Sequence, residues 1–175
     1  HRAKQLPGRK QVKFIKSMRY PYSILVIILF VSFKLNAAVL TCGNKTNYPS
    51  IQNAINAAVP YDTIEVQPGH YKQGNLLITK PISMFAKGLV ILDGDFKCEI
   101  ITIKSNHVLI RGFSIKNSSN LSSIDIAGIK VLACKDVTIE NNNVEKCSFG
   151  IYLSNTNHCK VKNNLISGNV LAETN

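Results

Sequence analysis

Tryptophan is absent from this chain of 175 residues, and aromatic side chains together make up only 7% of it. The chain is therefore poorly supplied with the surfaces on which proteins stack single-stranded nucleic acids or sugars. Acidic residues are also few, ten against 21 Lys and Arg, and the net charge of +11 at first indicates a nucleic acid or an anionic membrane as partner. Eight of the basic residues precede Ala38, however, so the rest of the chain has a net charge of only +3. This distribution excludes a basic nucleic-acid-binding domain.

The sequence also lacks an apolar run long enough to cross a bilayer. Residues 24–33 form an apolar run of only ten positions, whereas a spanning helix needs about 20. The run lies between Arg19 and Lys34, and the small residues Ala37 and Ala38 follow it. This order is typical of a secretory signal peptide that is cleaved near Ala37. An uncleaved anchor helix is the alternative, and after cleavage no transmembrane span is expected.

These signals divide the chain into three segments: a non-native or upstream extension over 1–17, a signal peptide over 18–37, and a folded domain over 38–175. The folded domain is expected in the periplasm. With 45% hydrophobic and 18% charged residues, the chain has enough apolar material for one core.

Cysteine is scarce, and no two cysteines have the CxxC spacing. An exported chain meets an oxidising compartment in which disulfides form, but an odd number of cysteines leaves at least one thiol unpaired. The sequence leaves the pairing open, and the simpler interpretation is a set of small, half-buried side chains. The five are Cys42, Cys98, Cys134, Cys147 and Cys159.

One helix is predicted, and it directly follows Pro49. Ser50 is placed to cap it, and one face of the helix is apolar. Beyond Pro60 the apolar residues alternate, which indicates short strands. The apolar face of the helix consists of Ile51, Ala54, Ile55 and Ala58.

The strands belong to a repeat of about 22 residues. The segment 127–147 aligns with 149–169 at a constant offset of 22, so that Ile129 matches Ile151 and Val131 matches Leu153. The segment 100–117 has the same pattern at a longer offset, and 80–94 resembles it more faintly, with Ile82 and Met84 in the places of Val108 and Ile110. A unit this small cannot bury its own apolar side chains, but copies stacked on one another can.

The repeat therefore predicts an all-β solenoid of parallel strands, with a short N-terminal capping helix and like side chains stacked on like. One continuous interior is expected from Ile101, Ile103, Val108, Ile110, Ile129, Val131, Val137, Ile139, Ile151, Leu153 and Val161.

Asparagine recurs at the corners of the predicted coils, where Asn141 matches Asn163. Asparagine tolerates the left-handed backbone of such a corner, and its amide can hydrogen-bond to the asparagine of the next coil. Gly112 takes the same corner one coil earlier, as a position with positive φ would require. The alternatives for the Asn-rich segments are plain polar loops or glycan acceptors at Asn44, Asn117 and Asn120.

These motifs resemble the right-handed parallel β-helix of the pectate-lyase-like superfamily, and within it the NosD family of periplasmic maturation factors of nitrous oxide reductase. The resemblance rests on DTIEVQPGHY (62–71), HVLIRGFSIKNS (107–118), AGIKVLACKDVTIENN (127–142) and FGIYLSNTNHCKVKNNLISGN (149–169). It implies a non-enzymatic scaffold that works with the ATPase and permease subunits of an ABC transporter, and with a copper chaperone, to supply copper to the reductase. Because NosD proteins are longer, the resemblance also implies an N-terminal part of a β-helix whose later coils are missing.

The rival prediction is a carbohydrate-active enzyme, a polysaccharide lyase or a uronate epimerase. Such an enzyme needs carboxylates or a cation, together with a base, at one groove. Asp93 and Asp95 could bind Ca²⁺, but two carboxylates so close together are more typical of a turn. His158 with Cys159 is the one close pair of soft ligands, whereas His70 and His107 stand alone in the sequence. Cys159 is expected to point inward, and we predict no catalytic, cofactor or metal residue.

Overall fold

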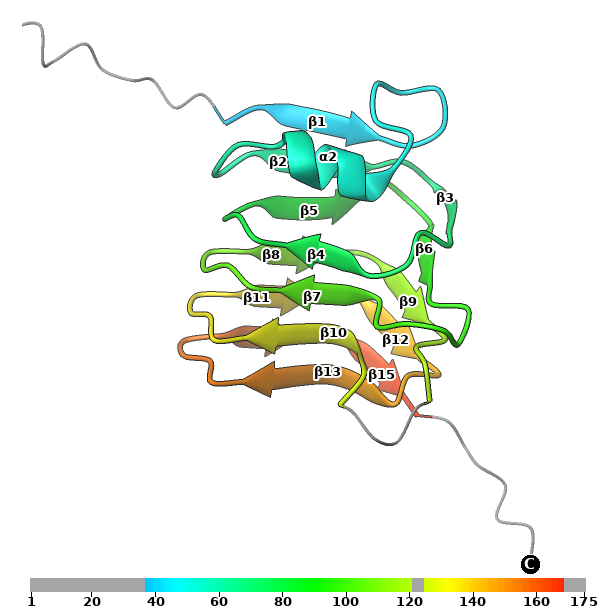
Figure 1. Cartoon of the computed structure of the whole chain (residues 1–175), viewed down its shortest axis with the longest axis vertical. Coiled ribbons are helices and arrows are strands. Elements are labelled where there is room, and N and C mark those ends of the chain that lie inside the picture. Colours follow the sequence, from blue (N-terminus) through cyan, green and yellow to red (C-terminus); the bar gives the residue numbers. More distant parts are fainter. Residues whose placement is uncertain (1–36, 121–124, 169–175) are drawn as a thin grey trace, which may run out of the picture. The chain divides into compact units, whose positions relative to one another are not determined.

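The computed structural model describes residues 37–120 and 125–168, and every structural statement below concerns these residues (Figure 1). The described residues all belong to one compact unit. The predicted signal peptide and upstream extension lie outside the described residues, apart from Ala37 at the end of the predicted signal. Within the described part, no helix is both long and apolar enough to cross a membrane.

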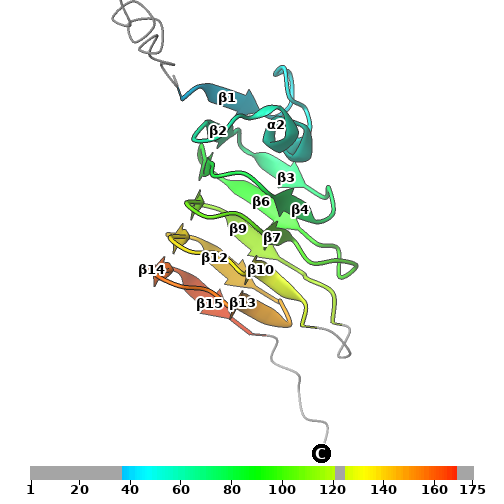
Figure 2. The same cartoon turned by 60° about the vertical axis from the view of Figure 1, so that its left-hand side comes forward.

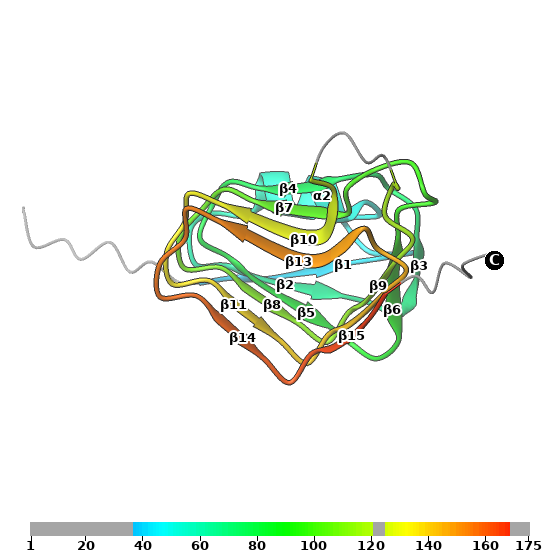
Figure 3. The same ribbon diagram turned by 90° about the horizontal axis from the view of Figure 1, so that it is seen from below.

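The described chain coils through three parallel sheets, which we call A, B and C, and they surround one interior (Figures 2 and 3). Sheet A contains β1 (Val39–Cys42), β2 (Thr63–Val66), β5 (Ser83–Ala86), β8 (Leu109–Arg111), β11 (Thr138–Glu140) and β14 (Lys160–Lys162). Sheet B contains β3 (Gly69–Tyr71), β6 (Val90–Asp93), β9 (Ser114–Lys116), β12 (Asn143–Glu145) and β15 (Leu165–Ser167). Sheet C contains β4 (Leu76–Ile78), β7 (Ile101–Ile103), β10 (Ala127–Leu132) and β13 (Phe149–Ser154). This is the parallel β-helix that the repeat predicts.

The register of the coils is the predicted one. Ile129 pairs with Ile151 and Val131 with Leu153, at the offset of 22. Across the longer turn Ile101 pairs with Ile129. Equivalent apolar side chains therefore stack along the interior, because each strand presents its alternate residues to the same side.

Burial follows the prediction except in the last described coil. The predicted interior residues from Ile101 to Ile139 are at most 1% exposed, and Cys159 packs against the core as expected. Leu153 and Val161 occupy the predicted columns but are 41% and 43% exposed, and Ile151 is half-buried. The prediction of their burial was wrong because no described coil lies on them, and an interior column is covered only by the next coil.

The helix α2 (Ile51–Ala57) lies at the first end of the stack and contacts β1, β2 and β4 (Figure 1). Ile51, Ala54 and Ile55 are buried on its inner face. The predicted capping by the Ser50 side chain was wrong, since that side chain makes no capping hydrogen bond. The Ile51 N–H donates instead to Oε1 of Gln73, at 2.8 Å, from the next turn of the chain.

Side chains also hydrogen-bond to other backbone groups at this first end of the stack. The Gln52 amide bonds both the N–H and the C=O of Leu77 in β4, at 2.9 and 3.2 Å, so α2 takes the place of a further strand beside that edge. Lys80 Nζ donates to the carbonyl oxygens of Asn56 and Ala58, at 2.7 and 2.6 Å, and so satisfies the end of the helix. These contacts protect a sheet edge that would otherwise be open to pairing.

The asparagine ladder exists, but one residue later than predicted. Asn141 and Asn163 have the expected left-handed backbone, with φ of 55° at each, as Gly112 does with φ of 86°. Their side chains are exposed, and the stacked amides are those of Asn142 and Asn164, at 3.0 Å. The left-handed residue turns its own side chain to solvent and the next residue inward, which is why the prediction chose the wrong asparagine.

The ladder amides bond the backbone of neighbouring coils. Oδ1 of Asn142 accepts the N–H of Phe113, and its Nδ2 donates to the carbonyl of Ile110, at 3.0 and 3.2 Å. The equivalent contact of Asn164 Nδ2 reaches the carbonyl of Ile139, at 2.9 Å. The side chain of Asn142, whose residue is only 2% exposed, thus satisfies two backbone groups of the preceding coil and also bonds Asn164 of the next coil.

Replacing Asn142 with Leu is expected to leave the Phe113 N–H and the Ile110 carbonyl unpaired in a buried corner. The free energy of unfolding should fall by about 2–5 kcal/mol, measured by urea denaturation. The matched control is Asn141→Gly, which keeps the left-handed corner and should change stability by less than about 1 kcal/mol. Equal losses in the two variants would contradict the ladder.

Candidate functional site

Polar side chains gather where β3 and β6 of sheet B end. We call this cluster the His70 corner, and it lies between two surface hollows of about 450 and 260 Å³. His70 lines the larger hollow, Asp95 lines the smaller, and Lys72 lines both. The members of the His70 corner are His70, Lys72, Asp93, Asp95 and Lys97.

A histidine–carboxylate pair forms the centre of the corner. Nε2 of His70 lies 2.7 Å from Oδ2 of Asp93, and the side chains are 47% and 5% exposed. Oδ1 of Asp93 accepts from the Asn117 amide and from the Asp95 N–H, each at 2.9 Å. Burial by itself raises the pKa of Asp93, but these hydrogen bonds outweigh it and hold the pKa below the usual value. An ionised carboxylate only accepts, so His70 donates from Nε2 and is held in one orientation.

Asp95 is neutralised by two lysines. Lys72 Nζ lies 2.7 Å from its Oδ1, and Lys97 Nζ lies 2.6 Å from its Oδ2. The hydrogen bond from Lys72, followed by that from Lys97, lowers the pKa of Asp95 to about 2. Every oxygen of the two carboxylates is thus engaged by a protein donor.

Asp93 and Asp95 lie in a turn, which is the second of the two interpretations that the sequence offered, a Ca²⁺ site or a turn. Lys97 N–H donates to the Gly94 carbonyl at 2.9 Å, and Asp95 and Phe96 between them both have positive φ. A Cβ atom on Gly94 would lie 2.5 Å from the Asn117 carbonyl oxygen, so only glycine allows this approach of the neighbouring coil. The turn therefore positions Asp93 and Asp95 by backbone contacts between coils.

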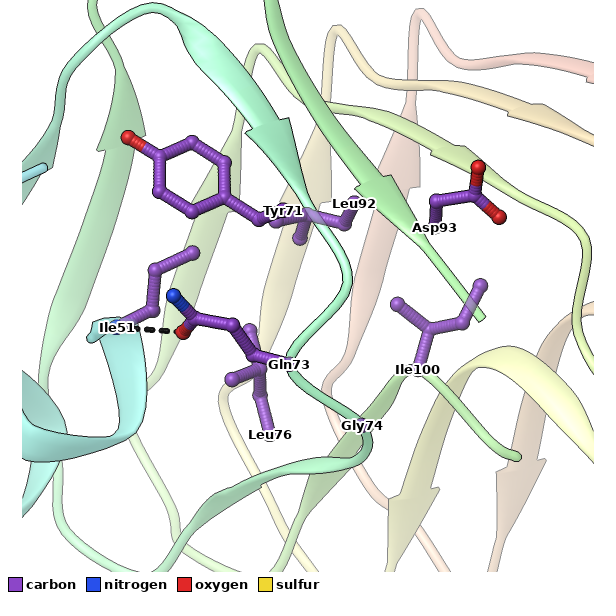
Figure 4. A pocket seen from close by; sticks show the side chains of 8 residues that line it. All are labelled: Ile51, Tyr71, Gln73, Gly74, Leu76, Leu92, Asp93 and Ile100. Carbon is purple, nitrogen blue, oxygen red and sulfur yellow. Dashed lines mark hydrogen bonds between the residues drawn. The ribbon is translucent and has the colours of Figure 1, made fainter. Parts of the chain in front are cut away.

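A small cavity lies behind the corner, under the start of α2 (Figure 4). Its volume is about 10 Å³, room for at most one water. Half of its eight lining residues are aliphatic, and Asp93 lies at its side; the aliphatic residues are Ile51, Leu76, Leu92 and Ile100. Any ligand of the His70 corner would therefore bind in the open hollows.

The other two histidines in the described ranges also have a carboxylate partner. His107 and His158 lie on either side of Asp136, with their Nδ1 atoms 3.6 and 3.8 Å from its carboxylate oxygens. All three residues have left-handed backbone, so they occupy one column of corners in successive coils. His70 and His107, which stand alone in the sequence, thus each have a carboxylate partner in the structure. In the described ranges no group of three His, Cys, Asp or Glu is arranged to hold a metal ion.

The five cysteines are free thiols in this structure. Cys42, Cys134 and Cys147 are buried, and Cys98 and Cys159 are half-buried. Burial raises the pKa of the Cys42 thiol to about 11. These properties are those of small core side chains, since a reactive cysteine needs an accessible thiolate.

A second polar cluster, which sequence reasoning missed, lies on the outer face of sheet C. Lys130 Nζ is 3.0 Å from Oε2 of Glu99, the other oxygen of which bonds Thr102. The ring of Tyr152 lies 5.6 Å from Lys130 Nζ, and its hydroxyl donates to Asp125 at 3.0 Å. The register of the sequence repeat could have revealed this cluster, because Thr102, Lys130 and Tyr152 are equivalent positions of three successive coils. The register does not connect His70 with Asp93, because the equivalent position of His70 in the next coil is Ile91.

Comparison with known proteins shows similarity to a family profile, to a curated protein and to a solved structure. The profile of the family described as "Right handed beta helix region" matches residues 49–173. The "Probable ABC transporter binding protein NosD" of Pseudomonas aeruginosa is 27% identical over 96 residues, which are 54% of this chain and 22% of that protein. The chain thus spans about a fifth of the length of this relative. Among solved structures, a pectin methylesterase mutant in complex with a hexasaccharide matches with a TM-score of 0.49 and 16% identity, over 74% of this chain and 50% of its own.

Replacing Asp93 with Asn should destabilise the protein, because an amide cannot accept all the hydrogen bonds that the buried carboxylate accepts. We expect a loss of about 1–3 kcal/mol in the free energy of unfolding, measured in urea at pH 7. Asp95→Asn is the matched control at an exposed position and should have a clearly smaller effect. A larger effect of Asp95→Asn would contradict the assignment of Asp93 as the residue that holds the corner.

The lowered pKa of Asp95 makes a separate prediction for acid conditions. Its carboxylate should titrate near pH 2 in the folded protein and near its ordinary value of 3.8 when the protein is unfolded. Its ion pairs therefore stabilise the fold above about pH 4, and this contribution is lost as the pH falls towards 2. A carboxyl NMR titration measures this, and Lys72→Met should move the midpoint upward. A midpoint that does not move would show that Lys72 is not the main cause.

Proposed function

The chain belongs to the family of right-handed β-helix proteins, and from that premise we propose that it is an exported, non-catalytic accessory protein. It acts with an ABC transporter in assembling the copper centre of nitrous oxide reductase. The observation that carries the proposal is the match to the Pseudomonas NosD protein, whose name describes an ABC transporter binding protein. Because the match covers about a fifth of that relative, the partners and the activity are proposals for the whole protein.

The use of the acidic side chains supports the non-catalytic role. A lyase or epimerase needs carboxylates or a bound cation directed, together with a base, at one groove. Six of the nine described carboxylates are engaged in separate pairs with Lys, Arg or His side chains, mostly between neighbouring coils. These pairs are Glu65 with Lys87, Asp93 with His70, Asp95 with Lys72 and Lys97, Glu99 with Lys130, Asp136 with His107 and His158, and Glu140 with Arg111 and Lys162. Such side chains hold coils together and present a surface of mixed charge to other proteins.

The proposed location is the periplasm, where the protein would meet its partners. These are the ATPase and permease subunits of the transporter, a copper chaperone and the reductase. Copper is the cargo of this assembly, delivered to the reductase. A stack of rigid coils suits this role, since repeat proteins offer extended surfaces to several partners at once.

A second candidate function, a carbohydrate-active enzyme, is favoured by the His70 corner. His70 is half exposed, is oriented by the buried carboxylate of Asp93, and borders a hollow of about 450 Å³ beside Lys72. An oriented imidazole next to a cation is a pair that could remove a proton from a uronate and bind its carboxylate. This candidate makes His70 indispensable, whereas the accessory role does not.

Deletion of the gene in its own bacterium should separate the two functions. Under the accessory role, nitrous oxide reductase is still synthesised and exported, but its catalytic copper centre stays unfilled, as metal analysis and activity of the purified reductase would show. Complementation with wild type, and equally with His70→Ala, should restore copper. Normal copper content and activity in the deletion strain would overturn the accessory role, and an altered uronate polysaccharide that His70→Ala fails to restore would establish the enzyme.

A further inference from the structure

Asp62 is a buried acidic residue that the His70 corner does not use. It is only 3% exposed and lies in the corner between α2 and β2. Its Oδ2 accepts the Val59 N–H at 2.8 Å, and its Oδ1 accepts the Ala38 N–H at 2.7 Å. Two backbone amides thus hold the carboxylate.

The charge of Asp62 has no cationic partner among the described residues. Two other carboxylates with little exposure do: Glu99 has Lys130, and Glu140 has Lys162. Lys80, which follows the next strand, uses its ammonium group on the carbonyls at the end of α2. A buried carboxylate without a countercharge is costly, so this position calls for a positive charge next to Oδ1.

The atom next to Oδ1 is the backbone nitrogen of Ala38, and its position is fixed from the other side as well. The Ala38 carbonyl accepts the Thr63 N–H at 2.8 Å, and Val39 begins the pairing of β1 with β2. Ala37 and Ala38 are both exposed. The peptide bond between them is also the small-residue end of the export signal that the sequence predicts.

We infer that a peptidase of the export pathway cleaves the bond between Ala37 and Ala38, and that Asp62 is the receptor for the α-ammonium group of Ala38 formed by this cleavage. Water adds to the Ala37 carbonyl carbon and the C–N bond breaks. Ala37 leaves as a carboxylate, and the Ala38 nitrogen gains a proton to become an ammonium group. A neutral N–H beside a buried carboxylate is thereby replaced by a cation with three donors. The inference does not depend on the role in copper assembly.

The geometry selects one bond among the neighbouring small residues. Cleavage after Ala38 would remove the nitrogen that contacts Oδ1 and leave Asp62 with the Val59 N–H alone. Cleavage before Ala37 would leave the Ala38 nitrogen an uncharged amide. Only the bond between Ala37 and Ala38 produces a positive charge at 2.7 Å from the carboxylate, and the processed form is therefore the more stable form.

The first test is the N-terminus of the native protein. Exported protein purified from the periplasm, analysed by N-terminal sequencing and intact mass, should begin at Ala38. A chain that begins at Ala37 or at Val39, or that keeps the predicted signal, would overturn the inference. This test needs no variant, so it does not depend on whether a substituted protein folds.

The second test measures the pairing itself. The processed protein should melt about 4–8 °C higher than the same protein with its upstream segment retained. Asp62→Asn should reduce this difference to about 1 °C or less, because an amide gains little from the new positive charge. The matched control is Asp125→Asn, at an exposed carboxylate on a different sheet, and it should leave the difference unchanged. A difference that persists in Asp62→Asn would overturn the role of Asp62.

Discussion

The structure depends on one constraint, the stacking of coils that cannot bury their own apolar side chains. A strand of three residues, such as β7 or β11, offers one or two inward side chains and no stability alone. Stacked in register, Ile101, Ile129 and Ile151 form one column across three coils. Burial and backbone pairing thus arise together, and each coil provides the surface for the next. The same constraint explains why the side chains of the last described coil remain partly exposed.

This architecture leaves unpaired backbone groups at open sheet edges and at coil corners, and polar side chains hydrogen-bond to them. At the first end Gln52 bonds the edge of β4, which a further strand would otherwise bond, and Gln73 bonds the first N–H of α2. At the corner between sheets A and B, the amides of Asn142 and Asn164 do this between coils. Amides suit both places because one group donates and accepts at once. The short helix and the ladder are therefore two solutions to the same problem of unpaired backbone.

Charge is arranged by the same stacking. Glu140 and Lys162 lie one coil apart and neutralise one another, and His70 and Asp93 bond between coils in the same way. Such pairs favour a stable scaffold with a mixed surface, which agrees with an accessory role beside other proteins. Asp62 is the exception, a buried carboxylate bonded only to backbone amides. Its position beside Ala38 connects the fold to export, because the missing positive charge is one that processing would create.

The sequence by itself determined the coil length, the register and the interior columns. It could do so because stacking makes residues one repeat apart neighbours in adjacent coils. The offset between Ile129 and Ile151 in the sequence therefore already predicts their contact. Only the tertiary structure decided which asparagine points inward, which glutamine caps the helix and which carboxylate each histidine meets. These contacts join non-equivalent positions, as Gln73 with Ile51 and His70 with Asp93 show. They depend on the backbone angles of the corners, which turn one side chain to solvent and its neighbour to the core, and no periodic pattern records that direction.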